Sequence, residues 1–173
     1  LKEQEKRLFN QIPARLRTGI SENEAKELFW WLWRCLPQAA TKLLDDENLL
    51  LMPAETRIPD GSIWSHASLT AAIAGALAGY DLTSEDVVNK WPTGKQLSHA
   101  YLVSFTFSPV QELIKASRKM RDFWAGSWIL HYLSAQVCWQ LAQQYGPDSL
   151  IYPSLYAQPL IDRWLLEKYP DFK

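Results

Sequence analysis

The chain has 173 residues, of which 47% are hydrophobic and 21% are charged, and its formal net charge is −1. This composition is typical of a chain that buries a hydrophobic core, and it excludes disorder throughout. A charge so close to zero also excludes a global basic field that would draw the whole chain onto nucleic acid. Nine tryptophans predict large buried contacts or a broad interface.

The sequence matches neither a membrane-spanning segment nor a signal peptide. No apolar run reaches the roughly 18 residues of a membrane span, and the charged first residues do not match a signal peptide. We therefore expect a cytoplasmic protein with no membrane partner. The two cysteines, Cys35 and Cys138, lie in apolar helical surroundings and are expected to be buried free thiols.

The first part of the chain has a helical pattern. A short helix and a turn are expected over residues 1–20. Ser21 followed by Glu24 is a capping-box pattern, and residues 25–36 then carry apolar side chains at helical spacing. Pro37 is expected to stop this helix.

Proline and glycine residues separate the predicted elements between residues 53 and 99. Two prolines and a glycine predict a loop over residues 53–61, and the small-residue segment 69–77 predicts a closely packing helix. A short helix is expected to begin at residues 83–86, where acidic side chains suit the helix dipole. Residues 93–99 have the composition of a linker, so we expect a helical domain over residues 1–92.

The pattern changes beyond the linker. Residues 101–107 are β-branched and aromatic with partial alternation, which predicts a strand. Ser108 follows as N-cap, Pro109 as first helical residue and Gln111 as third, a strong start signal for a helix. A helix N-terminus offers free N–H groups and partial positive charge, which favour phosphate.

The second part of the chain predicts an incomplete sheet. The helix is expected to run to about residue 144 with a break near residues 125–127. A second strand is predicted over residues 149–152 and an amphipathic helix over residues 160–169. Two strands alone are marginal, so further strands must come from elsewhere. The expected fold class is α+β, mostly α, with an unfinished strand-helix-strand unit in residues 100–173.

Basic side chains follow the predicted strand-to-helix junction. Lys115, Arg118 and Lys119 are expected to share a helix face with Asp122, close to Arg121. Two interpretations stay open, a phosphate-binding helix start or an ordinary capped helix with a solvated basic face. No glycine-rich phosphate loop or dinucleotide fingerprint accompanies the junction.

Metal and nucleophile patterns are weak. His66 lies near Glu55 and Asp60, but the three histidines lack metal-ligand spacing, so a packing role is favoured and no metal is expected. The acidic pair Asp45–Asp46 lacks the context of a phosphoryl-transfer site and is interpreted as a solvated turn. Ser65 and Ser127 are not part of a recognisable catalytic triad.

Three stretches of sequence are distinctive when taken together. They are PAETRIPDGSIWSHASLTAAIAGAL at residues 53–77, FTFSPVQELIKASRKMRDFWAGSWILHYLSAQ at residues 105–136 and SLIYPSLYAQPLIDRWL at residues 149–165. In this order they resemble the large subunit of type III-B (Cmr-type) CRISPR RNA-guided effector complexes. The middle stretch is the most specific of the three.

This resemblance implies a fold and a function. Residues 1–92 would be the later helices of an HD nuclease domain, and residues 100–173 the opening strand, helix and strand of a ferredoxin-like palm. In the family the HD domain cuts single-stranded DNA, and the palm pair converts ATP into cyclic oligoadenylates, with Mg or Mn. The implied partners are the other effector subunits, with guide RNA and target RNA reached through the complex.

The resemblance also implies a nucleotide site without catalytic residues. By this resemblance, residues of the strand-to-helix junction and of the basic segment that follows it would line the nucleotide pocket of the first palm. They are Ser108, Pro109, Val110, Gln111, Arg118, Lys119, Arg121 and Ser127. The family's His-Asp dipeptide is absent, because Ser65–His66 stands where relatives often show Asp-His. The catalytic G-G-D-D is also absent from these residues, so no catalytic residue is expected here.

Two other hypotheses compete with the effector-complex interpretation. One is a non-enzymatic adaptor that docks a protein partner through the Trp-rich helix of residues 24–36. It predicts that several of Trp30, Trp31 and Trp33 are exposed as a hot-spot patch. The other, a hydrolase that uses His66, predicts stoichiometric transition metal in the purified protein.

Overall fold

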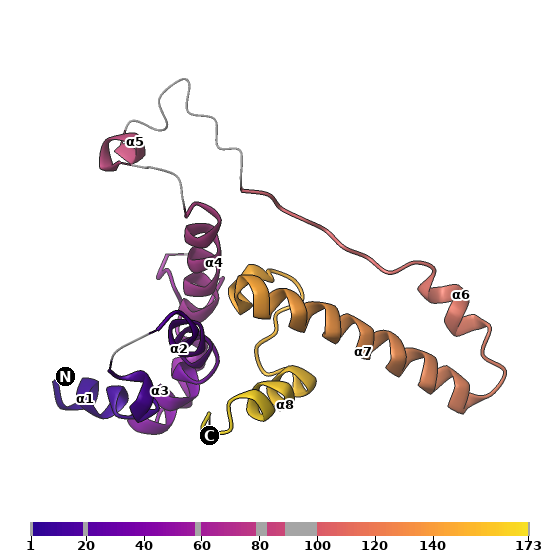
Figure 1. Cartoon of the computed structure of the whole chain (residues 1–173), viewed down its shortest axis with the longest axis horizontal. Coiled ribbons are helices and arrows are strands. Elements are labelled where there is room, and N and C mark those ends of the chain that lie inside the picture. Colours follow the sequence, from indigo (N-terminus) through magenta and orange to yellow (C-terminus); the bar gives the residue numbers. More distant parts are fainter. Residues whose placement is uncertain (1, 19–20, 58–59, 79–82, 89–99, 173) are drawn as a thin grey trace.

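The computed structural model describes residues 2–18, 21–57, 60–78, 83–88 and 100–172. Helices dominate these residues, which contain one isolated β-bridge, Pro53–Ser62, and no strand. The elements in chain order (Figure 1) are α1 (Lys2–Phe9), η1 (Ala14–Leu16), α2 (Glu22–Arg34), α3 (Leu36–Leu44), η2 (Glu47–Leu51), α4 (Ile63–Ala76), α5 (Ser84–Val88), α6 (Val110–Lys115), α7 (Met120–Tyr145), η3 (Pro147–Ser149) and α8 (Pro159–Lys168).

Local sequence sets the ends of α2. Ser21 Oγ accepts a hydrogen bond from Glu24 N at 3.4 Å, and Ser21 N donates to Glu24 Oε2 at 2.7 Å, so the predicted capping box is confirmed. α2 ends at Arg34, and α3 begins at Leu36 with Pro37 in its first turn. Proline is tolerated there because its missing N–H would have no helical partner. The predicted stop is therefore also the start of a new helix.

The hydrophobic core joins helices from both ends of the chain. Trp30 and Trp31 of α2 are each 3% exposed, and Ile161 and Leu165 of α8 are each 2% exposed. They form one cluster with Ala142 of α7. Because this core needs both ends of the chain, the stability of the fold depends on contacts that are distant in sequence.

Indole rings connect three helices across this core. The ring centroids of Trp30 and Trp139 lie 5.4 Å apart, and those of Trp139 and Trp164 lie 6.0 Å apart. Trp33 meets Trp30 edge-on at 6.0 Å. Since Trp30 and Trp31 are buried and Trp33 is half-buried, the exposed patch predicted by the adaptor hypothesis is wrong.

α7 has two halves in different surroundings. Its 26 residues span about 39 Å at the usual helical rise. Ala142 near its end is 1% exposed, whereas Trp124 and Trp128 near its start are 69% and 57% exposed. Figure 1 shows the start of α7 leading away from the other helices, with α6 at its far end. We call residues 100–133 the arm, and the described residues of 2–78 and 134–172 the body.

The two predicted strands are not formed. Residues 101–107 are extended, but Tyr101, Leu102 and Val103 are 80%, 87% and 82% exposed and the segment has no strand partner among the described residues. Ser149 of the second predicted strand is the last residue of η3, and residues 150–152 follow it without pairing. A strand is stable only when a neighbour satisfies its N–H and C=O groups. Of the expected α+β fold, the mostly helical part is therefore observed.

The helix predicted after Ser108 is two helices. Pro109, in extended conformation, is the N-cap of α6, and no side chain caps this end, so the predicted Ser108 cap is wrong. The break lies at residues 116–119 and not at residues 125–127, which continue within α7. One glycine costs a helix interior only about 1 kcal/mol, which the surrounding turns of α7 tolerate.

Other predicted elements agree with the structure. The described residues of the 53–61 segment form a loop, and α4, α5 and α8 match the predicted helices over or near residues 69–77, 83–86 and 160–169. The predicted linker, residues 93–99, lies outside the described residues, and the division at this point stays a prediction. No described helix combines the length and the apolar character that a membrane crossing requires.

Candidate functional site

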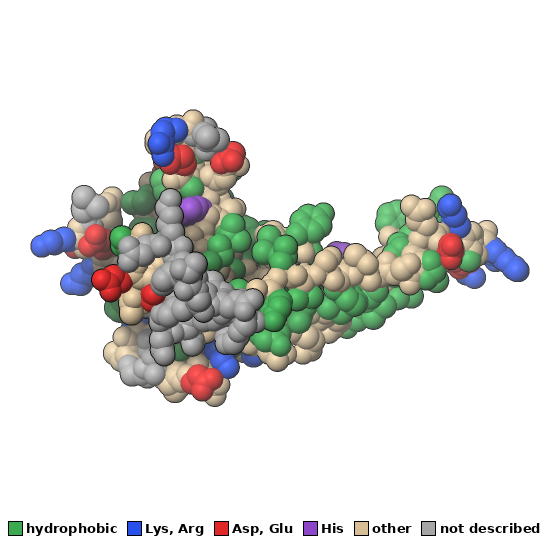
Figure 2. Space-filling model, turned by 90° about the horizontal axis from the view of Figure 1, so that it is seen from above, with side chains coloured by type: hydrophobic (Ala, Val, Ile, Leu, Met, Phe, Trp, Pro, Cys, Tyr) green, Lys and Arg blue, Asp and Glu red, His purple; other side chains and the backbone are tan. Residues whose placement is uncertain are grey.

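The residues predicted to bind nucleotide lie at the far end of the arm. Ser108 and Pro109 precede α6, and Val110 and Gln111 open it. All of the predicted residues except half-buried Val110 are exposed, the others being Ser108, Pro109, Gln111, Arg118, Lys119, Arg121 and Ser127. Figure 2 shows Lys and Arg side chains at this end, beyond hydrophobic side chains that run along the arm.

This segment does not enclose a ligand by itself. The basic side chains do not share one helix face as predicted, because α6 ends at Lys115 and α7 begins at Met120. Arg121 Nε lies 3.5 Å from Asp122 Oδ1, and both side chains are exposed. None of the predicted residues lines either of the two cavities described below. The exposed cations attract phosphate, but an ATP site would need additional walls.

Metal-binding candidates do not come together. No three His, Cys, Asp or Glu side chains of the described residues are placed to hold a metal ion. Glu55 instead accepts hydrogen bonds from Arg57 Nε and Nη2 at 3.0 Å each, which lowers the pKa of Glu55. His66 is exposed on α4. Asp46 Oδ1 accepts from Asn48 N at 3.0 Å and caps η2, so the acidic pair forms a turn as predicted.

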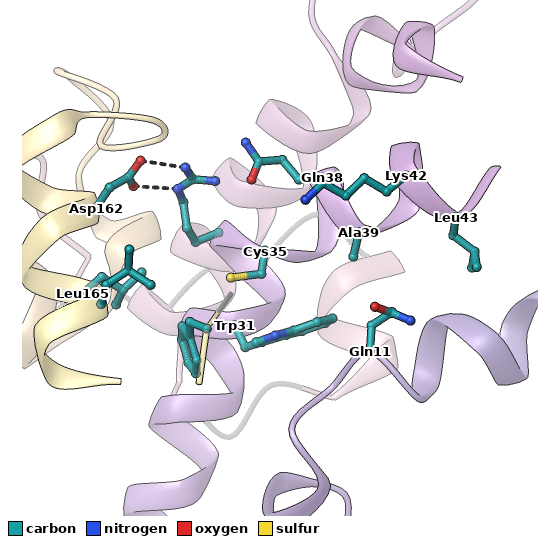
Figure 3. A pocket seen from close by; sticks show the side chains of 12 residues that line it. Gln11, Trp31, Cys35, Gln38, Ala39, Lys42, Leu43, Asp162 and Leu165 are labelled. Carbon is teal, nitrogen blue, oxygen red and sulfur yellow. Dashed lines mark hydrogen bonds and ion pairs between the residues drawn. The ribbon is translucent and has the colours of Figure 1, made fainter. Parts of the chain in front are cut away.

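A cavity of about 430 Å³ lies between α2, α3 and α8. Figure 3 shows Trp31 and Cys35 in its middle, Gln38 and Lys42 of α3 on one side, and Asp162 of α8 on the other. These side chains come from both ends of the chain. The cavity therefore exists only because α8 packs beside the first helices.

An arginine–carboxylate pair forms the most strongly charged wall of this cavity. Arg34 Nε and Nη2 donate to Asp162 Oδ1 and Oδ2 at 2.6 Å each, and the Arg34 guanidinium lies 4.9 Å from the centroid of the Tyr156 ring. The hydrogen bonds to Asp162 raise the pKa of Arg34. This two-pronged contact commits both charges to each other. The pair therefore ties α2 to α8 and leaves neither group available to catalysis.

The cysteines are not activated. Both are free thiols, as predicted, and both are half-buried. Burial raises the pKa of Cys35 to about 11 and also raises the pKa of Cys138. Because the thiolate is the nucleophile and the metal ligand, neither cysteine is poised for such chemistry near neutral pH.

A second ion-pair network joins η1, α2 and a residue near the C-terminal end of the described residues. Arg15 Nη1 donates to Glu27 Oε2 at 2.7 Å, and Arg15 Nε donates to Asp171 Oδ2 at 3.1 Å. These carboxylates raise the pKa of Arg15. Sequence reasoning missed the Arg15–Asp171 and Arg34–Asp162 pairs, which join residues 156 and 128 positions apart. No local pattern signals partners at such separations.

Comparisons with known proteins point to one family. The family model described as CRISPR-associated protein Cmr2, N-terminal, matches residues 102–173. The "CRISPR system Cmr subunit Cmr2" of Pyrococcus furiosus is 31% identical over 159 residues, which are 92% of this chain and 15% of that relative. The "CRISPR system CMR subunit Cmr2" of Saccharolobus solfataricus is 30% identical over 116 residues, which are 67% of this chain and 10% of that relative. The chain thus spans 15% or less of the curated relatives it matches. No solved structure matches this chain.

Proposed function

This chain belongs to the Cmr2 family, the large subunits of type III-B CRISPR effector complexes, and we propose that its role is assembly and nucleotide binding within such a subunit. The observation that carries the proposal is the arm, whose apolar surface and basic end are both exposed. The body is packed around its own core, whereas the apolar side chains of the arm are exposed.

The apolar side chains of the arm support packing against protein outside residues 1–173. The large exposed side chains of the first part of α7 are 44% to 73% exposed: Met120, Phe123, Trp124, Trp128, Ile129 and Leu133. Burying one such side chain fully is worth about 1.5–3 kcal/mol. We propose that residues 101–107 and α7 are the opening strand and helix of a ferredoxin-like palm, whose sheet covers this face. Residues 1–92 would be HD-like helices beside it.

The basic end of the arm supports a nucleotide role. Ser108–Gln111 and the side chains of Arg118, Lys119, Arg121 and Ser127 lie at this end. In the proposed palm they form one wall of an ATP site, and the other walls come from protein outside residues 1–173. The ATP serves cyclic oligoadenylate synthesis in the complex. The described residues offer no metal-ligand set, so Mg or Mn would be held elsewhere.

The proposed assembly includes other proteins and RNA. Other effector subunits are the direct partners, and guide RNA and target RNA are reached through them. The net charge of −1 supports indirect rather than direct contact with RNA, because the chain has no global attraction for a polyanion.

An ATP titration of the full-length protein tests the nucleotide role. Replacing Arg118→Ala together with Lys119→Ala is expected to weaken ATP binding by about tenfold or more, since charge-assisted hydrogen bonds are lost. The matched control is Lys6→Ala with Arg7→Ala, an adjacent exposed pair on α1, which is expected to change nothing. Equal ATP affinity in the arm variant and the control would refute the nucleotide site.

Hydrogen exchange tests the palm separately. In the 173-residue chain the amides of residues 101–107 are expected to exchange fast, because the segment is exposed and unpaired. In the full-length protein they are expected to be protected by about 100-fold or more, because strand pairing occupies them. Equally fast exchange in both proteins would show that these residues form no strand.

A further inference from the structure

A second hollow of the body is a groove of about 560 Å³ between α2, α4 and residues 148–156. Its size is within the range of sites that bind small molecules or side chains. Aromatic rings line it, from Phe29, Trp33, Trp64 and Tyr156. The indole N–H of Trp33 donates to Ser68 Oγ at 3.1 Å, and that of Trp64 donates to Leu49 O at 2.8 Å. These ring donors are satisfied, so the walls of the groove are predominantly apolar.

The α4 side of the groove lacks a covering element. α4 carries no Asp, Glu, Lys or Arg, yet none of its residues is buried. A helix that is hydrophobic on all sides is normally buried. Leu69 on α4 and Ile151 opposite are 45% and 56% exposed and both line the groove. This rim would gain from contact with another apolar surface.

One acid lines this groove without a cation. Asp148 is only 8% exposed, and no cationic side chain of the described residues approaches its carboxylate. Backbone N–H groups of Asp148 and Ser149 support the carboxylate, but burial still raises its pKa. A buried carboxylate without a cation is costly, and a cation placed beside it would relieve that cost.

Tyr156, whose ring lines the groove, has a hydroxyl on the side of Arg34 and Asp162 that is unpaired within the described part of the chain. The Tyr156 hydroxyl is buried and has no hydrogen-bond partner among the described residues. Unmade hydrogen bonds of buried groups are uncommon in native proteins and call for a partner. The groove therefore combines a carboxylate acceptor with aromatic walls.

We propose that this groove receives an arginine side chain carried on an apolar segment of a partner protein. A guanidinium can form a two-pronged contact with a carboxylate and stack on aromatic rings at the same time. The body already contains this arrangement once, where Arg34 pairs with Asp162 and lies over the Tyr156 ring. The apolar rim formed by Leu69 and Ile151 fits the residues that flank the arginine.

The chemistry of the groove separates this partner from nucleic acid. No Lys, Arg or His lines the groove, and its acid repels phosphate. The groove also shares no residue with the nucleotide-binding segment of the arm. The proposal is therefore independent of ATP binding, and either one can fail without the other.

Calorimetric titration of the full-length protein with blocked tripeptides tests the proposal. The probe is acetyl-Leu-Arg-Leu-amide, and the matched probe carries citrulline, which has nearly the same shape without the charge. We expect the arginine peptide to bind about tenfold tighter than the citrulline peptide. Asp148→Asn is expected to reduce this preference below about twofold, since the neutral side chain keeps the size of the acid.

Two further variants complete the test. Asp60→Asn neutralises an exposed acid outside the groove and is expected to keep the full preference. Ser65 lines the groove, so Ser65→Arg is expected to place a guanidinium inside it and to abolish peptide binding even if Asp148→Asn does not fold. Equal affinity for both peptides, a preference that survives Asp148→Asn, binding that survives Ser65→Arg, or no binding of the arginine peptide at millimolar concentration would each overturn the proposal.

Discussion

The body and the arm use the same residue types in opposite surroundings. Trp30 and Trp31 of the body are each 3% exposed, whereas Trp124 and Trp128 of the arm are 69% and 57% exposed. In the body Trp30 meets the ring of Trp139 from another helix, whereas Trp128 of the arm stacks on Tyr132 of its own helix. The difference shows that a high tryptophan content predicts extensive apolar packing, but it does not tell whether the packing partner lies within this chain.

The ion pairs of the body and of the arm also differ. The body ties distant elements together, as Arg34 does with Asp162 across 128 residues. The arm pairs Arg121 with its neighbour Asp122, at 3.5 Å and in solvent. Exposed pairs contribute little to stability, whereas removing one partner of a half-buried pair is costly because the other charge is left uncompensated. Stability is therefore expected to reside in the body, and the ion pair of the arm is expected to add little to it.

The largest expected contrast comes from tryptophan truncation in the 173-residue chain. Trp30→Ala removes a side chain that is 3% exposed and is expected to lower the free energy of unfolding by about 3–5 kcal/mol. Trp124→Ala removes one that is 69% exposed and is expected to change it by less than about 0.5 kcal/mol. Urea denaturation measures both. Similar losses from the two variants would show that the arm is packed in the isolated chain.

Thiol reactivity sharpens the same comparison. Burial raises the pKa of Cys35 from 9.0 to about 11, so at pH 8 its thiolate fraction, and with it its alkylation rate, is expected to be about 100-fold below that of an ordinary thiol. Measured in a Cys138→Ser background, the rate should rise with pH toward a midpoint near 11. The arm control is Ser127→Cys with both native cysteines replaced by serine, which is expected to react as a free thiol. Equal rates at the two positions would contradict the burial of Cys35.

The same raised pKa links stability to pH. The folded protein holds the Cys35 proton more tightly than the unfolded chain does. Its contribution to stability is therefore complete below about pH 9 and is lost as the pH rises toward about 11. Cys35→Ser should remove this part of the pH dependence, which denaturation at several pH values would show.

Breaking an ion pair is expected to have an intermediate effect. Asp162→Ala leaves the half-buried Arg34 guanidinium without its partner and should cost about 2 kcal/mol in the free energy of unfolding. The arm counterpart, Asp122→Ala, leaves an exposed arginine and should cost less than about 0.5 kcal/mol. Denaturation of the 173-residue chain measures both losses, and a cost at Asp122 equal to that at Asp162 would break the comparison.

Helix caps give the smallest expected difference. Ser21→Ala removes the side-chain acceptor of a formed capping box and should cost about 1 kcal/mol. Ser108→Ala should cost nearly nothing in the 173-residue chain, because no side chain caps α6. Thermal denaturation resolves the two. A matching loss for Ser108→Ala would mean that the serine caps its helix after all.

The elements that could be predicted are those with short-range causes. The capping box at Ser21, the loop near Pro53 and the final helix depend on residues a few positions apart, and the structure shows each of them. The strands at residues 101–107 and 149–152 were predicted from the same kind of pattern. They are not formed, because a strand depends on a neighbour that no local pattern supplies.

The candidate site divides in the same way. The basic run around Arg118 and Lys119 was visible in the sequence, and the structure places it at the exposed end of the arm. Its predicted shared helix face was wrong, because the chain breaks between Lys115 and Met120. The groove around Asp148 had no sequence signal, since its walls come from α2, α4 and a segment near the C-terminal end of the described residues.

By itself, the sequence determined the helical character of most segments, the capping box at Ser21 and the resemblance to the Cmr2 family, because these depend on side-chain types at short spacing. Only the tertiary structure decided which tryptophans are buried, that Arg34 meets Asp162, and that Asp148 lies in an aromatic groove. The physical reason is the same in each case. Burial and ion pairing depend on which surfaces the chain brings together, and Arg34 and Asp162, for example, lie 128 positions apart.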